Sequence, residues 1–215
     1  MTAIAATTAE PITRTRPGTR ALLLAGAWAG PLFVTSSLAQ LLTRDGFDLR
    51  RHPLSMLQLG HLGWLQTLTF VLTGLGIVAL SVALAAPGRR TLAVFLGLFG
   101  AGLVVAGLVA PDPEYGFPAG APAGRAEQMS GHAVAHATAA VLAFTALAGA
   151  CVVHVVRSIR RRAVAPAVLS GLVALVLLLP TPAAHASVQL AVTGLISFAW
   201  TTALALSALT GRTVR

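Results

Sequence analysis

Two histidines four residues apart, His132 and His136, open one of the long apolar segments of this 215-residue chain. On a helix, this spacing places both imidazoles on one face. Asp112 closes the preceding apolar segment between Pro111 and Pro113, where the backbone is rigid and off the helix. Two imidazoles and one carboxylate are ligands that zinc accepts, with a fourth position left for water. The predicted metal ligands are therefore Asp112, His132 and His136.

Zinc is the candidate cofactor because an open zinc site lowers the pKa of its bound water to ~7 and supplies a hydroxide nucleophile. Ser55 would then orient a substrate or hold the metal-bound water. Other candidates for the third ligand are Glu114, His52, His61 and His185. Two further interpretations stay open, because an HxxxH pair without a glutamate lacks the full zinc-protease signature. The same side chains would bind a polar ligand without a metal, or would form a structural hydrogen-bonded network.

The composition is typical of a membrane protein with little soluble mass. The chain is 56% hydrophobic and 10% charged, with a mean hydropathy of +0.81, whereas soluble domains carry about 25% charged residues. Its net charge of +9 comes from arginine without any lysine, a usage typical of a high-GC bacterium. These arginines sit at the ends of apolar segments, as membrane topology places them. Membrane lipids are therefore the expected partners, and nucleic acid is not.

Six apolar segments predict an all-α fold, a six-helix transmembrane bundle. The segments are 21–42, 62–86, 91–110, 131–156, 163–179 and 187–210. Each is long enough, or nearly so, to cross the ~30 Å hydrocarbon core as a helix, which satisfies every backbone hydrogen bond in lipid. The transmembrane domain covers 20–211, with a disordered cytoplasmic tail at 1–19 and a short cytoplasmic tail at 212–215. Glycines on the second and third segments predict close helix packing.

The distribution of arginine predicts that both termini are cytoplasmic. With the N-terminus inside, eleven arginines face the cytoplasm and four face outward, which satisfies the positive-inside rule. The inner set is Arg14, Arg16, Arg20, Arg89, Arg90, Arg157, Arg160, Arg161, Arg162, Arg212 and Arg215, and the outer set is Arg44, Arg50, Arg51 and Arg125. Five of the six acids and five of the six histidines then fall outside. We expect a multi-pass protein of the plasma membrane with an outward-facing polar site.

The first outer loop, 43–64, contains an apolar run from Leu54 to Leu62 that is too short to span a bilayer. We expect this run to lie flat at the interface or to dip back toward the bundle. Arg50 and Arg51 can pair with Asp48 or Asp112, or can meet lipid phosphates. Ser130 is expected to cap the fourth helix. The first and third loops should pack together over an outward pocket. The predicted ligand-binding residues are Arg51, His52, Ser55, Asp112, His132 and His136.

Part of the first outer loop resembles a known family. The run is Arg51-His52-Pro53-Leu54-Ser55-Met56-Leu57, followed by Leu59-Gly60 and Gly63-Trp64. It is similar to bacterial integral membrane proteins catalogued as domain of unknown function 998. Asp112-Pro113 with Gly116, and the Gly131-His132 pair, fit the same pattern, and the resemblance covers roughly residues 20 to 210. The resemblance implies a multi-helix membrane protein and brings no established activity.

These features predict an integral membrane protein whose outward pocket binds a lipid headgroup or a small polar ligand. One alternative is a metal-dependent membrane hydrolase acting on lipids. The Ser, Asp and HxxxH set resembles the hydrolases that include alkaline ceramidases and adiponectin receptors, although those have seven helices and carry HxxxH on the last. The other alternative is a structural or partner-binding membrane subunit. The sequence leaves enzymatic activity and oligomeric state open, and it contains no phosphate-binding loop, nucleophile elbow or dinucleotide fingerprint.

Overall fold

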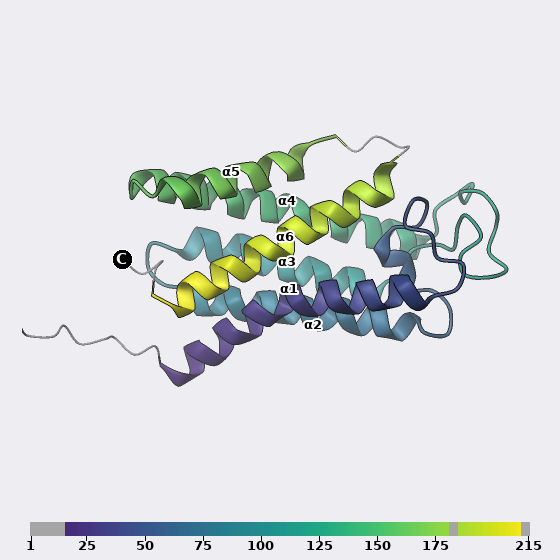
Figure 1. Cartoon of the computed structure of the whole chain (residues 1–215), viewed down its shortest axis with the longest axis horizontal. Helices are drawn as coiled ribbons and strands as arrows, with labels where there is room; N and C mark the ends of the chain where they lie inside the picture. The colour runs from purple at the N-terminus through teal and green to yellow at the C-terminus, as the bar shows by residue number, and fades with distance from the viewer. Residues whose placement is uncertain (1–15, 181–184, 212–215) are drawn as a thin grey trace, which may run out of the picture.

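The computed structural model describes residues 16–180 and 185–211, which form one helical bundle (Figure 1). Its elements are α1 (Pro17–Thr43), the short 3-10 helix η1 (Leu54–Gln58), α2 (Gly63–Leu84), α3 (Arg90–Leu108), α4 (Gly131–Arg160), α5 (Val164–Leu178) and α6 (Ala186–Leu209). Within this described part the only β-type pairing is an isolated bridge between Glu114 and Phe117. The prediction of an all-α fold is therefore confirmed.

The two ends of the bundle differ. The long loops 44–62 and 109–130 lie at the same end, which we call the loop end (Figure 1). The short turns 85–89 and 161–163 lie at the opposite end, which we call the turn end. Of the tails expected at 1–19 and 212–215, residues 1–15 and 212–215 lie outside the described residues. Helix α1 begins at Pro17, inside the segment expected as a tail.

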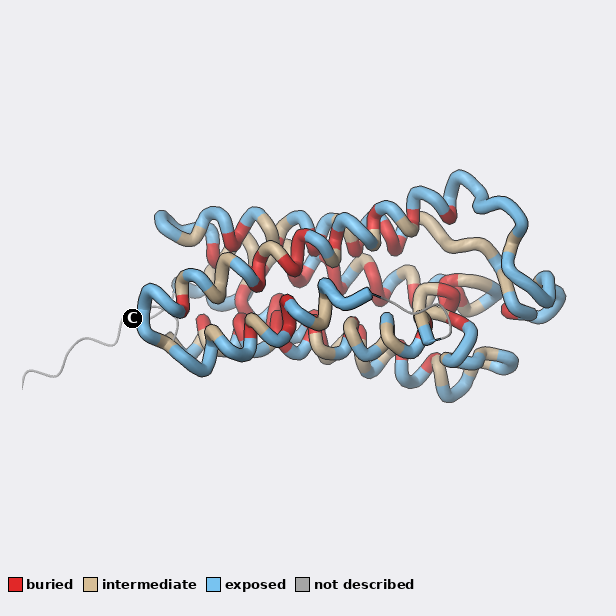
Figure 2. Tube along the Cα trace, turned by 90° about the horizontal axis from the view of Figure 1, so that it is seen from above, coloured by how far each residue is buried: buried red, intermediate tan, exposed pale blue. Residues whose placement is uncertain are grey.

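Five helices, α1, α2, α3, α4 and α6, are long and apolar enough to cross a membrane. Helix α5 has 15 residues, which is about 22 Å at a rise of 1.5 Å per residue and less than the ~30 Å hydrocarbon core. The outer faces of the helices are apolar and exposed, as at Trp28 (70% exposed) and Leu142 (63%). Figure 2 shows the buried residues along the sides that face the middle of the bundle. Such an exterior suits hydrocarbon and not water.

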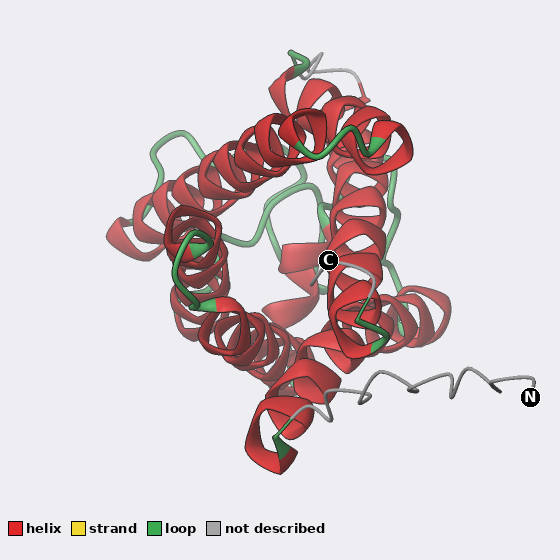
Figure 3. Cartoon of the chain, turned by 90° about the vertical axis from the view of Figure 1, so that its left-hand side faces the viewer, coloured by secondary structure: helices red, strands yellow, loops and turns green. Residues whose placement is uncertain are grey.

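The helices form a ring in the order α6, α1, α2, α3, α4, α5 (Figure 3). Neighbours in this ring pack closely, except α5 and α6, which contact each other sparsely. Aromatic side chains fill the middle. The ring centroid of Phe33 lies 4.4 Å from that of Phe198 and 5.3 Å from that of Phe70, and Phe99 lies 5.7 Å from Phe144. Phe99 also lies 6.1 Å from Phe198, so these aromatic contacts join α1, α2, α3, α4 and α6 in one core.

The first long loop folds back into the loop end of the ring. Met56, Leu57 and Gln58 are buried, Leu57 completely. The Gln58 side-chain amide donates to the carbonyl oxygen of Ala106 on α3 at 3.2 Å. Gly63 lacks a side chain where one is impossible, because a Cβ there would lie 1.8 Å from the Gln58 carbonyl oxygen. Of the two placements expected for this apolar run, the structure has the one that dips into the bundle.

Glycines bring α2 and α3 into backbone contact. A Cβ on Gly74 would lie 2.6 Å from the carbonyl oxygen of Gly100, and a Cβ on Gly100 would lie 2.7 Å from that of Gly74. Real Cβ atoms do not approach so closely, so both positions require glycine. The close packing predicted from these small residues is confirmed.

Replacing Gly100 by alanine is expected to lower the free energy of unfolding by about 1–3 kcal/mol, because the added methyl group collides with the Gly74 carbonyl. The matched control is Gly171→Ala on α5, where the nearest heavy atom to a Cβ is 3.9 Å away. The control should keep or slightly raise stability, since alanine favours a helix over glycine. Thermal unfolding in one detergent measures both variants, and equal midpoints would contradict the close contact of α2 with α3.

Candidate functional site

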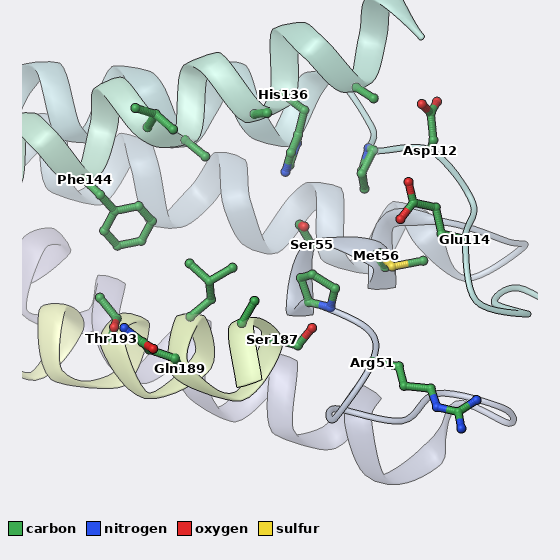
Figure 4. Close-up of a pocket in the computed structure, with 18 of the residues that line it drawn as sticks. Arg51, Ser55, Met56, Asp112, Glu114, His136, Phe144, Ser187, Gln189 and Thr193 are labelled. Atoms are coloured by element: carbon green, nitrogen blue, oxygen red, sulfur yellow. The ribbon is translucent and has the colours of Figure 1, made fainter. Parts of the chain in front are cut away.

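A cavity of about 830 Å³ lies at the loop end, between α4, α5, α6 and the two long loops (Figure 4). We call it the loop-end cavity. Its interior is apolar, with Ala137, Ala140 and Phe144 among the lining residues of α4. Its mouth is charged and is lined by Arg50, Arg51, Asp112, Glu114 and Arg125. The lining of α4 runs from Ala133 to Ala148, a length of about 22 Å.

Four of the six predicted ligand-binding residues line this cavity: Arg51, Ser55, Asp112 and His136. Figure 4 shows His136 directed into the cavity from α4 and Ser55 facing it from η1. The other two, His52 and His132, are not among the lining residues. Ligand binding at these six positions stays a prediction, because the position of a residue at a cavity wall does not show that it binds a ligand.

His136 joins α4 to the end of α3. Its Nδ1 lies 2.9 Å from the carbonyl oxygen of Ala106 and 2.9 Å from that of Val109. Carbonyl oxygens only accept, so Nδ1 carries the hydrogen, and Nε2 of the neutral ring is an acceptor. The side chain is 8% exposed, and its ring lies edge-on to Phe70 with the centroids 6.3 Å apart. The imidazole is thus held in one tautomer and one orientation at the cavity wall.

His52 ties the two long loops together. It is 2% exposed, and its Nδ1 accepts a hydrogen bond from the backbone N–H of Asp48 at 2.8 Å. The hydrogen therefore sits on Nε2, which donates to the carbonyl oxygen of Tyr115 at 3.2 Å. The imidazole also packs against Phe117, with ring centroids 5.4 Å apart. His52 therefore positions the loops that form the mouth and does not itself face the cavity.

Arg44 reinforces the same junction, a role that sequence reasoning missed. Its guanidinium donates to the carbonyl oxygens of Leu57, at 3.3 Å, and Leu59. It also lies over the ring of Phe117 at 5.4 Å from the centroid, within cation–π range. From the sequence alone, Arg44 contributed only to the prediction of topology.

Asp112 holds the start of α4. Its Oδ2 accepts from the backbone N–H of Ser130 at 2.8 Å, and Ser130 Oγ accepts from the N–H of Ala133 at 3.1 Å. The prediction that Ser130 caps this helix is confirmed. Hydrogen bonds from the side chain and backbone of Ser130 lower the pKa of Asp112, and the nearby His132 lowers it further. A carboxylate also suits this position because the helix dipole is positive at the N-terminus.

Polar residues of α6 also reach the cavity and were not predicted. Ser187, Gln189 and Thr193 line it from the first two turns of that helix, and Figure 4 shows them along its near side. Gln189 and Thr193 are four apart, so they share one face of the helix. That spacing is the sequence signal that could have found them.

The predicted metal ligands are not grouped as a metal site. Among the residues that the structure describes, no set of three or more His, Cys, Asp or Glu side chains is placed to hold a metal ion. Asp112 is bonded to Ser130, the Nδ1 of His136 is bonded to two carbonyls, and His132 is exposed. A metal at these residues therefore stays a prediction from the sequence, and no chemical step is derived through it.

The fold defines an all-helical integral membrane protein with several membrane-spanning helices. The chain belongs to the family described as protein of unknown function (DUF998), whose model matches residues 27–207. The family predicted from the run around Arg51 to Leu57 is therefore confirmed. No curated protein and no solved structure matches the chain.

Replacing His52 by alanine is expected to lower the free energy of unfolding by about 1–3 kcal/mol, because the junction of the two loops loses a buried imidazole and its part-buried hydrogen bonds to the Asp48 N–H and the Tyr115 carbonyl. The matched control is His132→Ala, where the side chain is exposed and the change should stay within about 0.5 kcal/mol. Thermal unfolding in detergent measures both. A larger loss at His132 than at His52 would show that the histidine of the HxxxH pair, and not His52, supports the loop end.

Proposed function

We propose that the loop-end cavity binds a membrane amphiphile, with an anionic headgroup at the mouth and an apolar chain in the interior. The observation that carries this proposal is the division of one continuous cavity into a charged mouth and an apolar interior. A volume of about 830 Å³ lies within the usual ligand-pocket range of ~300–1,000 Å³. This volume suits one lipid chain with its headgroup.

The mouth favours an anionic headgroup because its acids are already engaged. Asp112 accepts from the Ser130 N–H, and Glu114 Oε1 accepts from the backbone N–H of Ala126 at 3.3 Å. Three arginines line the same mouth. Guanidinium groups bind phosphate and carboxylate oxygens in a bidentate manner. Phosphate-containing lipids are therefore the favoured ligand class, and the six predicted ligand-binding residues are interpreted as the mouth and its supports.

The headgroup should decide which lipid binds. In water, each buried CH₂ group contributes ~0.8 kcal/mol. A lipid that enters from the bilayer leaves hydrocarbon that is as apolar as the cavity wall, so burying its chain brings little net gain. Binding strength then depends on the polar contacts at the mouth. This reasoning points to selection by headgroup charge, with the chain setting only the length that fits.

We also propose that all six α-helices, the short α5 included, cross the plasma membrane with both termini cytoplasmic, so that the cavity opens outward. The eleven-to-four distribution of arginine supports this orientation. Helix α5 would cross where the bilayer thins around it, a cost of fractions of a kcal/mol per Å.

The orientation predicts which substituted cysteines react from outside the cell. Asp45→Cys, in the first long loop, should react with a membrane-impermeant maleimide on intact cells. Ala86→Cys, in the α2–α3 turn, should react only after the membrane is opened. Both positions are exposed, and the native Cys151 is buried, so it should not interfere. The opposite labelling pattern would invert the orientation.

Filling the cavity should displace the lipid. We expect Ala140→Phe to lower the amount of lipid retained per chain by about tenfold, equivalent to ~1.4 kcal/mol. Ala135→Phe is the matched control, because Ala135 is exposed on α4 and does not line the cavity. Lipid that survives purification in a mild detergent is identified and counted by native mass spectrometry.

A second variant tests the mouth without changing the interior. Arg51→Gln should reduce the preference for anionic over zwitterionic lipid by about tenfold, since it removes a charged hydrogen-bond donor. The proposal fails if the wild type retains no lipid, or if Ala140→Phe and Ala135→Phe retain equal amounts.

A further inference from the structure

A second, smaller cavity lies at the opposite end of the bundle. It has a volume of about 160 Å³ and is lined by the end of α2, the α2–α3 turn, the start of α3, the last turns of α4, the start of α5 and one residue of α6. We call it the turn-end cavity. Its polar lining consists of Arg89, His154, Arg157, Ser158 and Arg161. We propose that the turn-end cavity binds a phosphate group, carried by an anionic lipid or present as the free ion.

The cationic lining is built along one face of α4. His154, Arg157, Ser158 and Arg161 stand at positions i, i+3, i+4 and i+7, which lie one above another on a helix. Arg89 reaches the same cavity from the turn before α3. Three guanidinium groups from two parts of the chain therefore surround one small space, which is the arrangement that phosphate recognition uses.

The end of α4 is fixed by a closed set of backbone hydrogen bonds. The N–H of Arg162 donates to the carbonyl oxygen of Ile159, and the N–H of Ala163 donates to that of Ser158, both at 2.9 Å. Arg162 adopts the left-handed conformation, with φ of +55°. This pattern is the Schellman motif, in which one residue in the left-handed conformation, usually a glycine, ends the helix. The motif holds Arg161 at the rim of the cavity.

The inner wall of the cavity is also held in place. The Nδ1 of His154 lies 2.9 Å from Ser170 Oγ, and the indole N–H of Trp200 donates to the same oxygen at 3.0 Å. The rings of His154 and Trp200 stand at 90° with centroids 5.8 Å apart. Contacts from α5 and α6 thus orient the His154 side chain before any ligand arrives.

Charge balance favours an anion at this end. Among the described residues, every aspartate and glutamate lies in the two long loops: Asp45, Asp48, Asp112, Glu114 and Glu127. Helix α4 separates these loops from the turn end by about 45 Å. Burial, together with the positive charges of Arg161 and Arg157, lowers the pKa of Arg89. An anion placed among these guanidinium groups would be attracted by each of them.

The size of the cavity accommodates a phosphate group. A protein cavity of ~150 Å³ accommodates a benzene molecule, and a phosphate group is smaller. The chains of a lipid would remain outside, so only its headgroup phosphate would enter. Basic pockets between membrane helices are known to take anionic headgroups on the cytoplasmic side. This site is independent of the loop-end cavity, with which it shares no lining residue.

The test uses the full chain in detergent and compares Arg157→Gln with Arg160→Gln. Arg160 is the exposed neighbour on the same helix and does not line the cavity. Three probes are titrated separately: phosphatidic acid, phosphatidylcholine with the same chains, and inorganic phosphate. Native mass spectrometry gives the affinity, and the thermal unfolding midpoint gives the stabilisation. Arg89 and Arg161 make further interactions within the chain, which is why Arg157 is chosen for the main variant.

The expected result is saturable binding of a phosphate probe that Arg157→Gln weakens by about tenfold or more, whereas Arg160→Gln changes it less than about twofold. Binding of phosphatidic acid alone identifies a lipid headgroup, and equal binding of inorganic phosphate identifies the free ion. Binding that the two variants reduce equally, or no binding by the wild type, overturns the proposal. If Arg157→Gln does not fold, Arg157→Lys with its control Arg160→Lys decides the same question, because lysine keeps the charge and loses the bidentate geometry. The Arg51→Gln variant tests the loop-end cavity separately. A loss of lipid there does not change the result expected for phosphate binding at the turn-end cavity.

Discussion

The loop end of the bundle depends on the first long loop being buried among the helices. Non-helical backbone at membrane depth must find partners inside the protein, because lipid offers none. Here the carbonyl oxygens of Leu57 and Leu59 accept from Arg44, and the Gln58 amide binds a carbonyl of α3. Leu57 supplies the apolar contact, being completely buried. Because η1 is fixed in this way, Ser55 and its neighbours can form one wall of the cavity.

The same loop also explains why the second long loop is ordered. His52 binds the backbone of both loops, and Phe117 inserts between Phe47, His52 and Arg44. The second loop in turn delivers Asp112 to the N-terminus of α4, where the carboxylate meets the Ser130 N–H. These polar groups of the loop end therefore have structural partners, whereas the buried Oε1 of Gln58 has none among the described residues. The arginines of the mouth are the groups whose charge is directed toward a ligand in our proposal.

The features that could be predicted from the sequence are those that depend on a local pattern of residues. Hydropathy alone predicted the all-α membrane fold, the Ser130 side chain predicted the helix cap, and the run from Arg51 predicted the family. The sequence could not predict that His132 is exposed and His136 is buried, since their spacing places both on one face of the helix. Helix α3 ends at Leu108, so Val109 still meets His136, while His132 one turn further out is exposed. The spacing of Gln189 and Thr193 marks a polar face on α6, but no local pattern tells which helices become the neighbours of α5 and α6.

The contact between α5 and α6 closes the helix ring and is the sparsest contact between neighbouring helices. A ligand could therefore enter between these two helices. Helix α5 is the shortest helix, packs on α4 and contacts α6 only sparsely. A Cβ on its glycine, Gly171, would meet no atom nearer than 3.9 Å, unlike the tight crossing of α2 with α3. Both cavities have α5 in their walls, one at each end of that helix. A displacement of α5 away from α6 would therefore open either cavity toward the bilayer without disturbing the aromatic core, which contains no residue of α5.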